Sequence, residues 1–239
     1  EDYSDEWKAE LEYTKSGKLL CSIANIILIL ENDPALAGRI VHDQFTGMDA
    51  AKSSLPWKPQ PGQWTDSDDA NLRVWLERNY DITGKDKISD ALTAVLTRHS
   101  YHPIRDYLNG LQWDGVPRLD KIVIDYMGAE DNALNRAMCR KHFTAAVARV
   151  FQPGCKYDYC LIMSGAEGIG KSTLLAIMGG SWFNDSITTT EGKEGMEQLR
   201  RAWLIELGEL SSIKRSDVEQ VKAYLSKQVD IYRAAYGRR

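Results

Sequence analysis

The chain lacks several features that mark whole classes of protein. Its longest apolar run, residues 23–30, is interrupted by Asn25 and is far shorter than the roughly 20 residues that span a bilayer. No internal repeat or low-complexity tract occurs along the 239 residues. We therefore expect no membrane partner and no repeat architecture.

Cysteine is scarce, and its positions suggest neither a disulfide framework nor a metal site. None of the four cysteines forms a C-x-x-C pair with another. They are Cys21, Cys139, Cys155 and Cys160. We expect four reduced thiols in a cytoplasmic protein. His99 and His102 are also weak metal candidates, because they lie three residues apart across a predicted helix end with Pro103 next.

Positive charge is not in excess either. The 30 Lys and Arg residues against 34 Asp and Glu residues give a formal net charge of −4 and a pI near 5.7. This balance argues against general adhesion to nucleic acid, so any contact must come from a local patch. One such patch, residues 133–156, contains no Asp or Glu. Its cations are Arg136, Arg140, Lys141, Arg149 and Lys156. Arg136 and Arg140 would share a helix face, which could follow phosphates, be solvated, or dock on the acidic N-terminal stretch.

What the chain does contain is one motif whose spacing points to a chemistry. Residues 165–172 read Gly-Ala-Glu-Gly-Ile-Gly-Lys-Ser, the G-x-x-x-x-G-K-[ST] pattern of a nucleotide-phosphate loop. The apolar and aromatic run 157–163 before it is typical of a buried parallel strand. Residues 172–178 after it predict a helix that ends at Gly179 and Gly180. Strand, loop and helix thus occur in the required order, although a plain glycine turn is the alternative.

Each residue type in this motif has a physical reason to be there. Gly165, Gly168 and Gly170 have no Cβ, so backbone N–H groups can wrap closely around phosphates at a helix N-terminus. Lys171 would reach the β- and γ-phosphates, and the Ser172 hydroxyl would be a Mg²⁺ ligand. We predict that a Mg-nucleoside triphosphate binds here. The predicted nucleotide-binding residues are Gly165, Ala166, Glu167, Gly168, Ile169, Gly170, Lys171, Ser172 and Thr173.

Hydrolysis also needs acidic groups on a neighbouring strand. In residues 202–207 an apolar run leads into Glu206, and Glu209 follows three residues later. Carboxylates at the C-terminal end of a core strand lie where ligands bind in open parallel sheets. We assign Glu206 to the Mg²⁺ shell and Glu209 to water polarisation, although the two roles could be exchanged. Together with Lys171 they are the predicted catalytic residues, unless Glu209 merely begins the solvated loop at Ser211.

With these motifs in place, residues 101–239 resemble the virulence-associated protein E family of phage and mobile-element proteins, which are similar to superfamily 3 helicases. The resemblance rests on the phosphate loop and on a series of other short segments. These are YHPIRDYL at 101–108, WDG at 113–115, RLD at 118–120, ARV at 148–150, PGCK at 153–156, WFND at 182–185, WLIELGE at 203–209 and YRAAYGR at 232–238. The earlier half also looks like the helical region that such proteins carry before the ATPase core.

The resemblance implies an ATP-driven, ring-forming motor or replication initiator that acts on DNA, in a bacterial or phage-infected cell. It implies an α/β P-loop NTPase fold of the AAA+ and superfamily 3 helicase type at residues 113–239, after a mostly α-helical domain at residues 1–112. Because only thirty residues follow Glu209 and include no later sheet strand, we expect a truncated core without its sensor and arginine-finger part, and weak turnover of ATP.

The DNA partner, expected to be single-stranded, would contact the C-terminal part of the chain. The resemblance places a channel-lining hairpin there, with Lys222 and Arg233 as DNA contacts. Tyr232 and Tyr236 are candidate stacking groups beside them. The alternative for residues 216–227 is an amphipathic helix with its charges in water.

The N-terminal half predicts organisation rather than chemistry. We expect helices at residues 19–30, after a cap at 66–69, and at 86–99, with a proline-rich loop at 56–61, together forming a small winged or helical bundle. Tryptophans at 57, 64 and 113 could stack on bases, but anchoring of loops is the commoner role.

Two further function classes share the phosphate loop. A P-loop kinase or other small-molecule phosphotransferase would need an arginine-rich lid and an acceptor pocket. A nucleotide-responsive DNA-binding or assembly module would bind ATP without significant hydrolysis. A kinase consumes ATP only with its acceptor, a motor is stimulated by DNA, and a binding module releases no phosphate.

Overall fold

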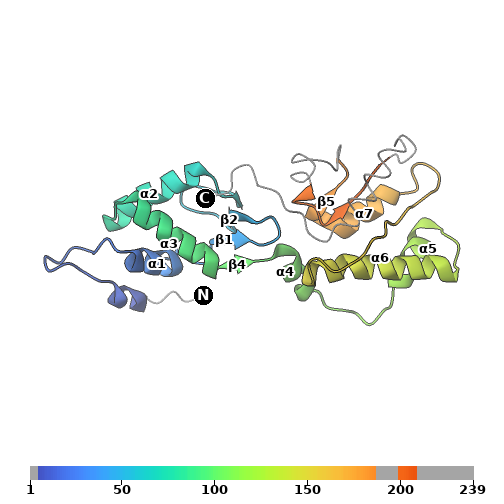
Figure 1. Ribbon diagram of the computed structural model, residues 1–239, viewed down its shortest axis with the longest axis horizontal. Coiled ribbons are helices and arrows are strands. Elements are labelled where there is room, and N and C mark those ends of the chain that lie inside the picture. Colours follow the sequence, from blue (N-terminus) through green and yellow to red (C-terminus); the bar gives the residue numbers. More distant parts are fainter. Residues whose placement is uncertain (1–4, 187–198, 209–239) are drawn as a thin grey trace. The chain divides into compact units, whose positions relative to one another are not determined.

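The computed structural model describes residues 5–186 and 199–208 of the chain (Figure 1). By its internal contacts the chain divides into two compact units, residues 1–106 and residues 107–239. We call them unit 1 and unit 2. The division drawn from the sequence places its boundary nearby, at residue 112. None of the described helices is long and apolar enough to cross a membrane.

Unit 1 contains a four-stranded sheet in the order β3-β2-β1-β4. Its strands are β1 (Ile40–Asp43), β2 (Met48–Ala51), β3 (Gly62–Gln63) and β4 (Ser100–Tyr101). β1 and β2 form an antiparallel hairpin, and β4 runs parallel to β1. In the turn the Asp43 carboxylate accepts the backbone N–H groups of Phe45 and Thr46 at 2.8 and 3.2 Å. Gly47 then adopts a φ of 61°, which a side chain would disfavour.

The described residues of unit 1 also form four helical segments before α4. They are the 3-10 helix η1 (Asp5–Glu10), α1 (Ile23–Asn32), α2 (Asp66–Tyr80) and α3 (Lys85–Arg98). The three predicted α-helices are confirmed. The first begins later than residue 19 because the Ser22 hydroxyl caps it, accepting the N–H of Asn25 at 3.2 Å. The cap of α2 is Thr65, which forms a capping box with Asp68.

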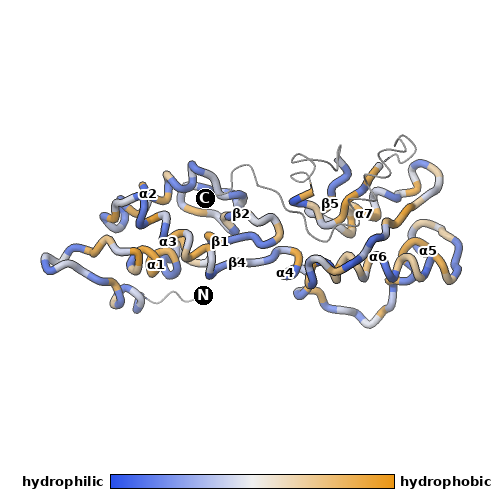
Figure 2. Tube along the Cα trace, viewed as in Figure 1, coloured by the Kyte–Doolittle hydropathy of each residue, from blue (hydrophilic) through white to orange (hydrophobic). Residues whose placement is uncertain are grey.

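The core of unit 1 is formed by residues of η1, α1, α2, α3, β1 and β2, together with residues of the connecting segments. α1 packs along α3, and side chains that are almost completely buried, such as Ile29 of α1, Leu72 of α2 and Leu92 of α3, belong to one core cluster. Figure 2 shows α1 as a nearly continuous hydrophobic segment. Such burial of apolar side chains is the main stabilising contribution to a unit of this size.

Trp57 and Trp64 belong to this core rather than to a stacking surface. Their indole N–H groups donate to Asp68 and Asp69 at 3.1 and 2.7 Å. Their rings pack edge to face with centroids 6.3 Å apart. The interpretation of these two tryptophans as loop anchors is therefore confirmed.

Unit 2 is a second mixed assembly of helices and a small sheet. After α4 (Pro103–Gly110), which spans the boundary, it comprises η2 (Leu119–Lys121), α5 (Ile122–Met127), α6 (Ala133–Phe151), α7 (Lys171–Gly179), η3 (Gly180–Trp182), β5 (Phe183–Asn184) and β6 (Leu204–Ile205). β5 and β6 pair in parallel, and α7 packs against both. η2 and α5 pack on α6.

The strand predicted at residues 157–163 is wrong. The structure shows no strand there, and the side chains of Tyr159 and Ile162 are 74% and 63% exposed. A strand needs a neighbour for its N–H and C=O groups. The sheet described in unit 2 pairs β5 only with β6, so the apolar run has no partner within the described residues.

Candidate nucleotide-phosphate site

The glycine loop leads directly into α7, as its spacing predicts. Gly168 and Gly170 have φ values of 76° and 91°, in the left-handed region that favours glycine, and Gly170 is the N-cap of the helix. A Cβ on Gly165 would lie 2.9 Å from Cδ1 of Ile169. The loop therefore favours glycine at these three positions, and it presents the N-terminus of a helix at its end.

Lys171, the first residue of α7, folds back over the loop. Its Nζ donates to the carbonyl oxygens of Gly165 and Ala166 at 3.0 and 2.8 Å. The ammonium group thus lies against the loop backbone, where phosphate oxygens would be stronger acceptors than the two neutral carbonyls. Glu167 and Ile169 are exposed in the same loop.

Ser172 and Glu206 come together from separate elements. The Ser172 hydroxyl in the first turn of α7 donates to Oε1 of Glu206 at 2.7 Å. Glu206 follows β6 directly, and its N–H donates to the Asn184 carbonyl at 2.9 Å, which extends the pairing of β5 and β6. The strand pair thus positions the carboxylate beside the helix N-terminus.

This pair has the geometry of two neighbouring ligands of one Mg²⁺ ion. Octahedral coordination at ~2.0–2.1 Å places adjacent oxygen ligands about 3 Å apart. The second carboxylate oxygen of Glu206, Oε2, is buried and has no hydrogen-bond partner among the described residues. A buried unpaired carboxylate oxygen is costly, and a cation would offset that cost. The residues present therefore fit a divalent cation.

A close contact holds α7 on the strand pair. A Cβ on Gly179 would lie 2.9 Å from Cβ of Phe183 in β5 and 3.3 Å from Cβ of Leu204 in β6. Only glycine permits this approach. The other end of the same helix carries Lys171 and Ser172, so the contact at Gly179 sets where those two side chains lie relative to Glu206.

Trp203 is a positioning residue that the sequence analysis did not identify. Its backbone N–H donates to the Trp182 carbonyl at 2.7 Å, and its indole N–H donates to the carbonyl of Ala146 in α6 at 2.9 Å. Trp203 therefore ties the strand that carries Glu206 to the long helix α6. Its place immediately before an apolar strand was visible in the sequence, but its partner was not.

The cationic patch at residues 133–156 is largely neutralised by acids from outside that range. Arg136 binds Asp131, with Nε to Oδ1 at 2.5 Å, and Arg140 binds Asp120 with two hydrogen bonds. These salt bridges lower the pKa of both aspartates. Lys156 lies 3.1 Å from Asp158, and Arg149 donates to the Tyr157 carbonyl at 3.0 Å. Lys141 alone of the five cations has no hydrogen bond or ion pair with a described residue.

The remaining predicted site residues are either exposed or lie outside the described residues. Thr173 is exposed in the first turn of α7. Glu209, Lys222, Tyr232, Arg233 and Tyr236 lie outside the described residues. Their predicted roles in water polarisation and DNA contact stay predictions.

His99 and His102 have separate partners. His99 lies 3.1 Å from Glu31, and His102 accepts the backbone N–H of Arg105 at 3.3 Å. No group of three or more metal-ligating side chains of His, Cys, Asp or Glu occurs among the described residues.

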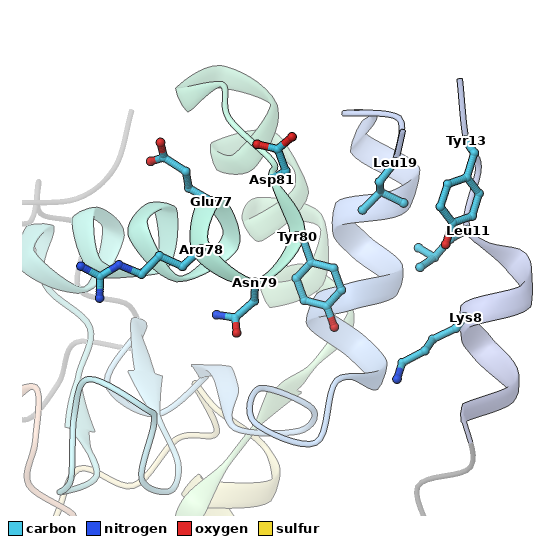
Figure 3. A pocket seen from close by; sticks show the side chains of 9 residues that line it. All are labelled: Lys8, Leu11, Tyr13, Leu19, Glu77, Arg78, Asn79, Tyr80 and Asp81. Carbon is cyan, nitrogen blue, oxygen red and sulfur yellow. The ribbon is translucent and has the colours of Figure 1, made fainter. Parts of the chain in front are cut away.

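A separate hollow of about 540 Å³ lies in unit 1, between the N-terminal segment and the end of α2 (Figure 3). Some of its polar side chains bind other residues of the unit. The Tyr80 hydroxyl donates to Asp33 at 2.5 Å, and Lys8 pairs with Asp5 at 2.7 Å. Burial and the neighbouring Asp33 raise the pKa of Tyr80. The glycine loop is therefore the stronger candidate for a functional site.

The glycine loop lies within the region that a comparison with known protein families matches. Residues 108–239 match the model of the virulence-associated protein E-like domain, and this match covers more than half of the chain. A search of curated proteins found no significant match.

Proposed function

Since the chain belongs to the virulence-associated protein E family, we propose that unit 2 binds Mg-ATP at residues 165–173 and serves an ATP-hydrolysing, helicase-like motor or replication initiator. The family match by itself supports the coarser statement that this is a phage- or mobile-element-associated protein. The proposed fold of the unit is a P-loop NTPase of the AAA+ and superfamily 3 helicase type.

The contact between Ser172 and Glu206 carries this proposal. A simple glycine turn would not require a carboxylate from 34 residues further along the chain at the first turn of the helix. A Mg-nucleotide site does require one there, because the loop hydroxyl and a strand carboxylate act on the same ion.

Different residues of the site would bind the phosphates and the cation. The loop N–H groups and the N-terminus of α7 would bind the phosphates, and Lys171 would exchange its two carbonyl partners for β- and γ-phosphate oxygens. Ser172 and Glu206 would hold Mg²⁺, which supplies positive charge against the negative charge of the phosphates. Glu209, outside the described residues, is the proposed group that polarises water, with the alternative that it and Glu206 exchange roles.

The proposed partners are single-stranded DNA and further copies of the chain in a ring. Lys222 and Arg233 remain the proposed DNA contacts of the C-terminal part. The alternative function is a nucleotide-responsive DNA-binding or assembly module, in which the same site binds ATP without significant hydrolysis.

Titration of the 239-residue chain with a fluorescent ATP analogue, with and without Mg²⁺, tests the proposal. Lys171→Ala should weaken binding about 10- to 150-fold, because hydrogen bonds to charged groups contribute about 1.5–3 kcal/mol. Lys141→Ala, the matched control on α6, should leave the affinity unchanged. An unchanged affinity in Lys171→Ala would overturn the phosphate-loop assignment.

Phosphate release then separates the function classes. Release that single-stranded DNA stimulates, and that Glu206→Gln abolishes while the Mg²⁺-independent part of nucleotide binding remains, is the result expected of a motor. Tight binding without release would favour the binding module. Release only upon addition of a small-molecule acceptor would favour a phosphotransferase.

A further inference from the structure

The C-terminal end of α5 lies against the glycine loop. Cε of Met127, the last residue of that helix, is 3.5 Å from the position that a Cβ on Gly170 would occupy. Gly170 is the N-cap of α7, so the thioether lies beside the start of the proposed phosphate site. Met127 is half-buried there. None of the phosphate or Mg²⁺ contacts proposed above uses this side chain.

The local sequence ends α5 directly after Met127. Gly128 has a φ of 68°, in the left-handed region, and its N–H donates to the carbonyl of Ile124 at 3.1 Å. The N–H of Ala129 donates to the carbonyl of Val123 at 3.1 Å. Two such bonds around a left-handed glycine are the Schellman arrangement that terminates helices. The chain therefore turns here and leaves Met127 at the helix end beside the loop.

Salt bridges on both sides of α5 hold it on α6. Arg140 of α6 binds Asp120, which lies in η2 directly before α5, through two hydrogen bonds. Arg136 of α6 binds Asp131, which follows α5, at 2.5 and 2.7 Å. Two-point pairs of guanidinium and carboxylate fix orientation as well as distance. The position of Met127 is therefore set by contacts outside the glycine loop.

The chemistry of a thioether suits a base rather than a phosphate. Methionine carries no charge and no hydrogen-bond donor, so it cannot act as Lys171 or the loop N–H groups would. Its flexible chain and polarizable sulfur pack favourably on aromatic rings. The base is the only aromatic part of a nucleotide. Ile169, which precedes Gly170 in the loop, adds a second apolar side chain that is 41% exposed.

We propose that Met127 contacts the base of the bound nucleotide, so that the end of α5 forms the nucleoside side of the site. This inference rests on the proposed function, because it requires the phosphates to lie in the glycine loop. One ribose joins the base to the phosphates, so a side chain that binds the base must lie close to the loop, as Met127 does. The contact involves no hydrogen bond to the base edge, so it contributes equally to the affinity for adenine and guanine nucleotides.

Isothermal titration calorimetry of the 239-residue chain with Mg-ATP and with Mg-tripolyphosphate separates base from phosphate binding, because tripolyphosphate has no nucleoside. Met127→Ala should weaken Mg-ATP binding about 5- to 10-fold, through loss of the sulfur–aromatic contact and of apolar area. Mg-GTP should weaken by the same factor. Binding of Mg-tripolyphosphate should stay within about twofold, which also shows that the variant is folded. Met127→Leu, which keeps an apolar side chain of similar size, should lose less than Met127→Ala.

Two control variants complete the test. Met138→Ala, at a half-buried methionine of α6, is the matched control and should change neither affinity. Lys171→Ala should weaken both Mg-ATP and Mg-tripolyphosphate, since Lys171 would bind the phosphates common to both.

Two outcomes would overturn the base contact and leave the phosphate site standing. The first is unchanged Mg-ATP affinity in Met127→Ala while Lys171→Ala still loses both ligands. The second is an equal loss of Mg-ATP and Mg-tripolyphosphate in Met127→Ala, which would make Met127 a support of the loop. Failure of the unchanged chain to bind either ligand would overturn the proposed function and the base contact together.

Discussion

The two units differ in where their apolar side chains lie. Unit 1 buries most of its large hydrophobic residues in one cluster that joins its helices and its sheet. In the described part of unit 2 the buried apolar residues are Cys139, Phe143, Val150 and Leu204, while many others, such as Ile177 and Tyr126, are exposed. Packing therefore stabilises unit 1, whereas glycine contacts and specific hydrogen bonds position the site of unit 2.

The largest expected effect is a core truncation in unit 1. Leu72 of α2 is 0% exposed, so Leu72→Ala should lower the free energy of unfolding by about 2–5 kcal/mol. Val74 lies on the same helix and is 43% exposed, so Val74→Ala should change it by less than about 1 kcal/mol. Urea denaturation measures both. Similar losses in the two variants would contradict the assignment of the core.

Gly179→Ala should have the next largest effect, and it acts on unit 2. The added methyl group would meet Phe183 and Leu204, and such overpacking costs about 1–3 kcal/mol. Because α7 must shift, nucleotide affinity should fall as well. Gly110→Ala is the matched control, since a Cβ there has nothing within 4 Å. Normal nucleotide binding in Gly179→Ala would show that this contact does not position the loop.

Trp203→Phe should have a smaller effect, because it removes one hydrogen bond and keeps an aromatic ring. Loss of the bond to Ala146 should cost about 0.5–1.5 kcal/mol, more if the carbonyl is left unpaired. If Trp203 positions Glu206, the variant should also need more Mg²⁺ for half-maximal nucleotide binding. Trp113→Phe, at a side chain that is 78% exposed, should change neither quantity.

The smallest expected effect is a dependence of stability on pH in both units. Burial lowers the pKa of His102 in unit 1 and of His142 in unit 2. The unfolded chain therefore binds these protons more readily than the folded chain. The stability that the two neutral histidine rings contribute should be fully present above about pH 6.5. It should be lost as the pH falls through their lower folded pKa values.

Thermal melts at several pH values test this expectation. His142→Gln should reduce the loss of stability below pH 6.5, and His102→Gln should reduce a separate part of it. If neither variant flattens the profile, the burial of the two rings does not account for the acid sensitivity.

The sequence predicted features whose cause is local. The caps at Ser22 and Thr65 begin helices near the expected places, and the spacing of Gly165, Gly168 and Gly170 predicted the loop that leads into α7. Local signals such as hydroxyl caps and glycine conformations need no distant partner, so a single sequence suffices to predict them.

Features that depend on distant partners were missed or misjudged. The cations of α6 looked unopposed because Asp120 and Asp131 precede the segment. The strand predicted at residues 157–163 has the right composition but no described neighbour. Trp203 bonds a residue 57 positions away, which no local pattern reveals. In each case tertiary contacts decided the outcome.

A double-mutant cycle on Ser172 and Glu206 tests the central claim most directly. The measurement is the affinity of an ATP analogue as a function of Mg²⁺ for Ser172→Ala, Glu206→Gln and the double variant. If both side chains act on one ion, each single variant should lose the Mg²⁺-dependent part of the affinity, and the double variant should lose little more. Strictly additive losses, or Mg²⁺ dependence retained in both single variants, would contradict the account.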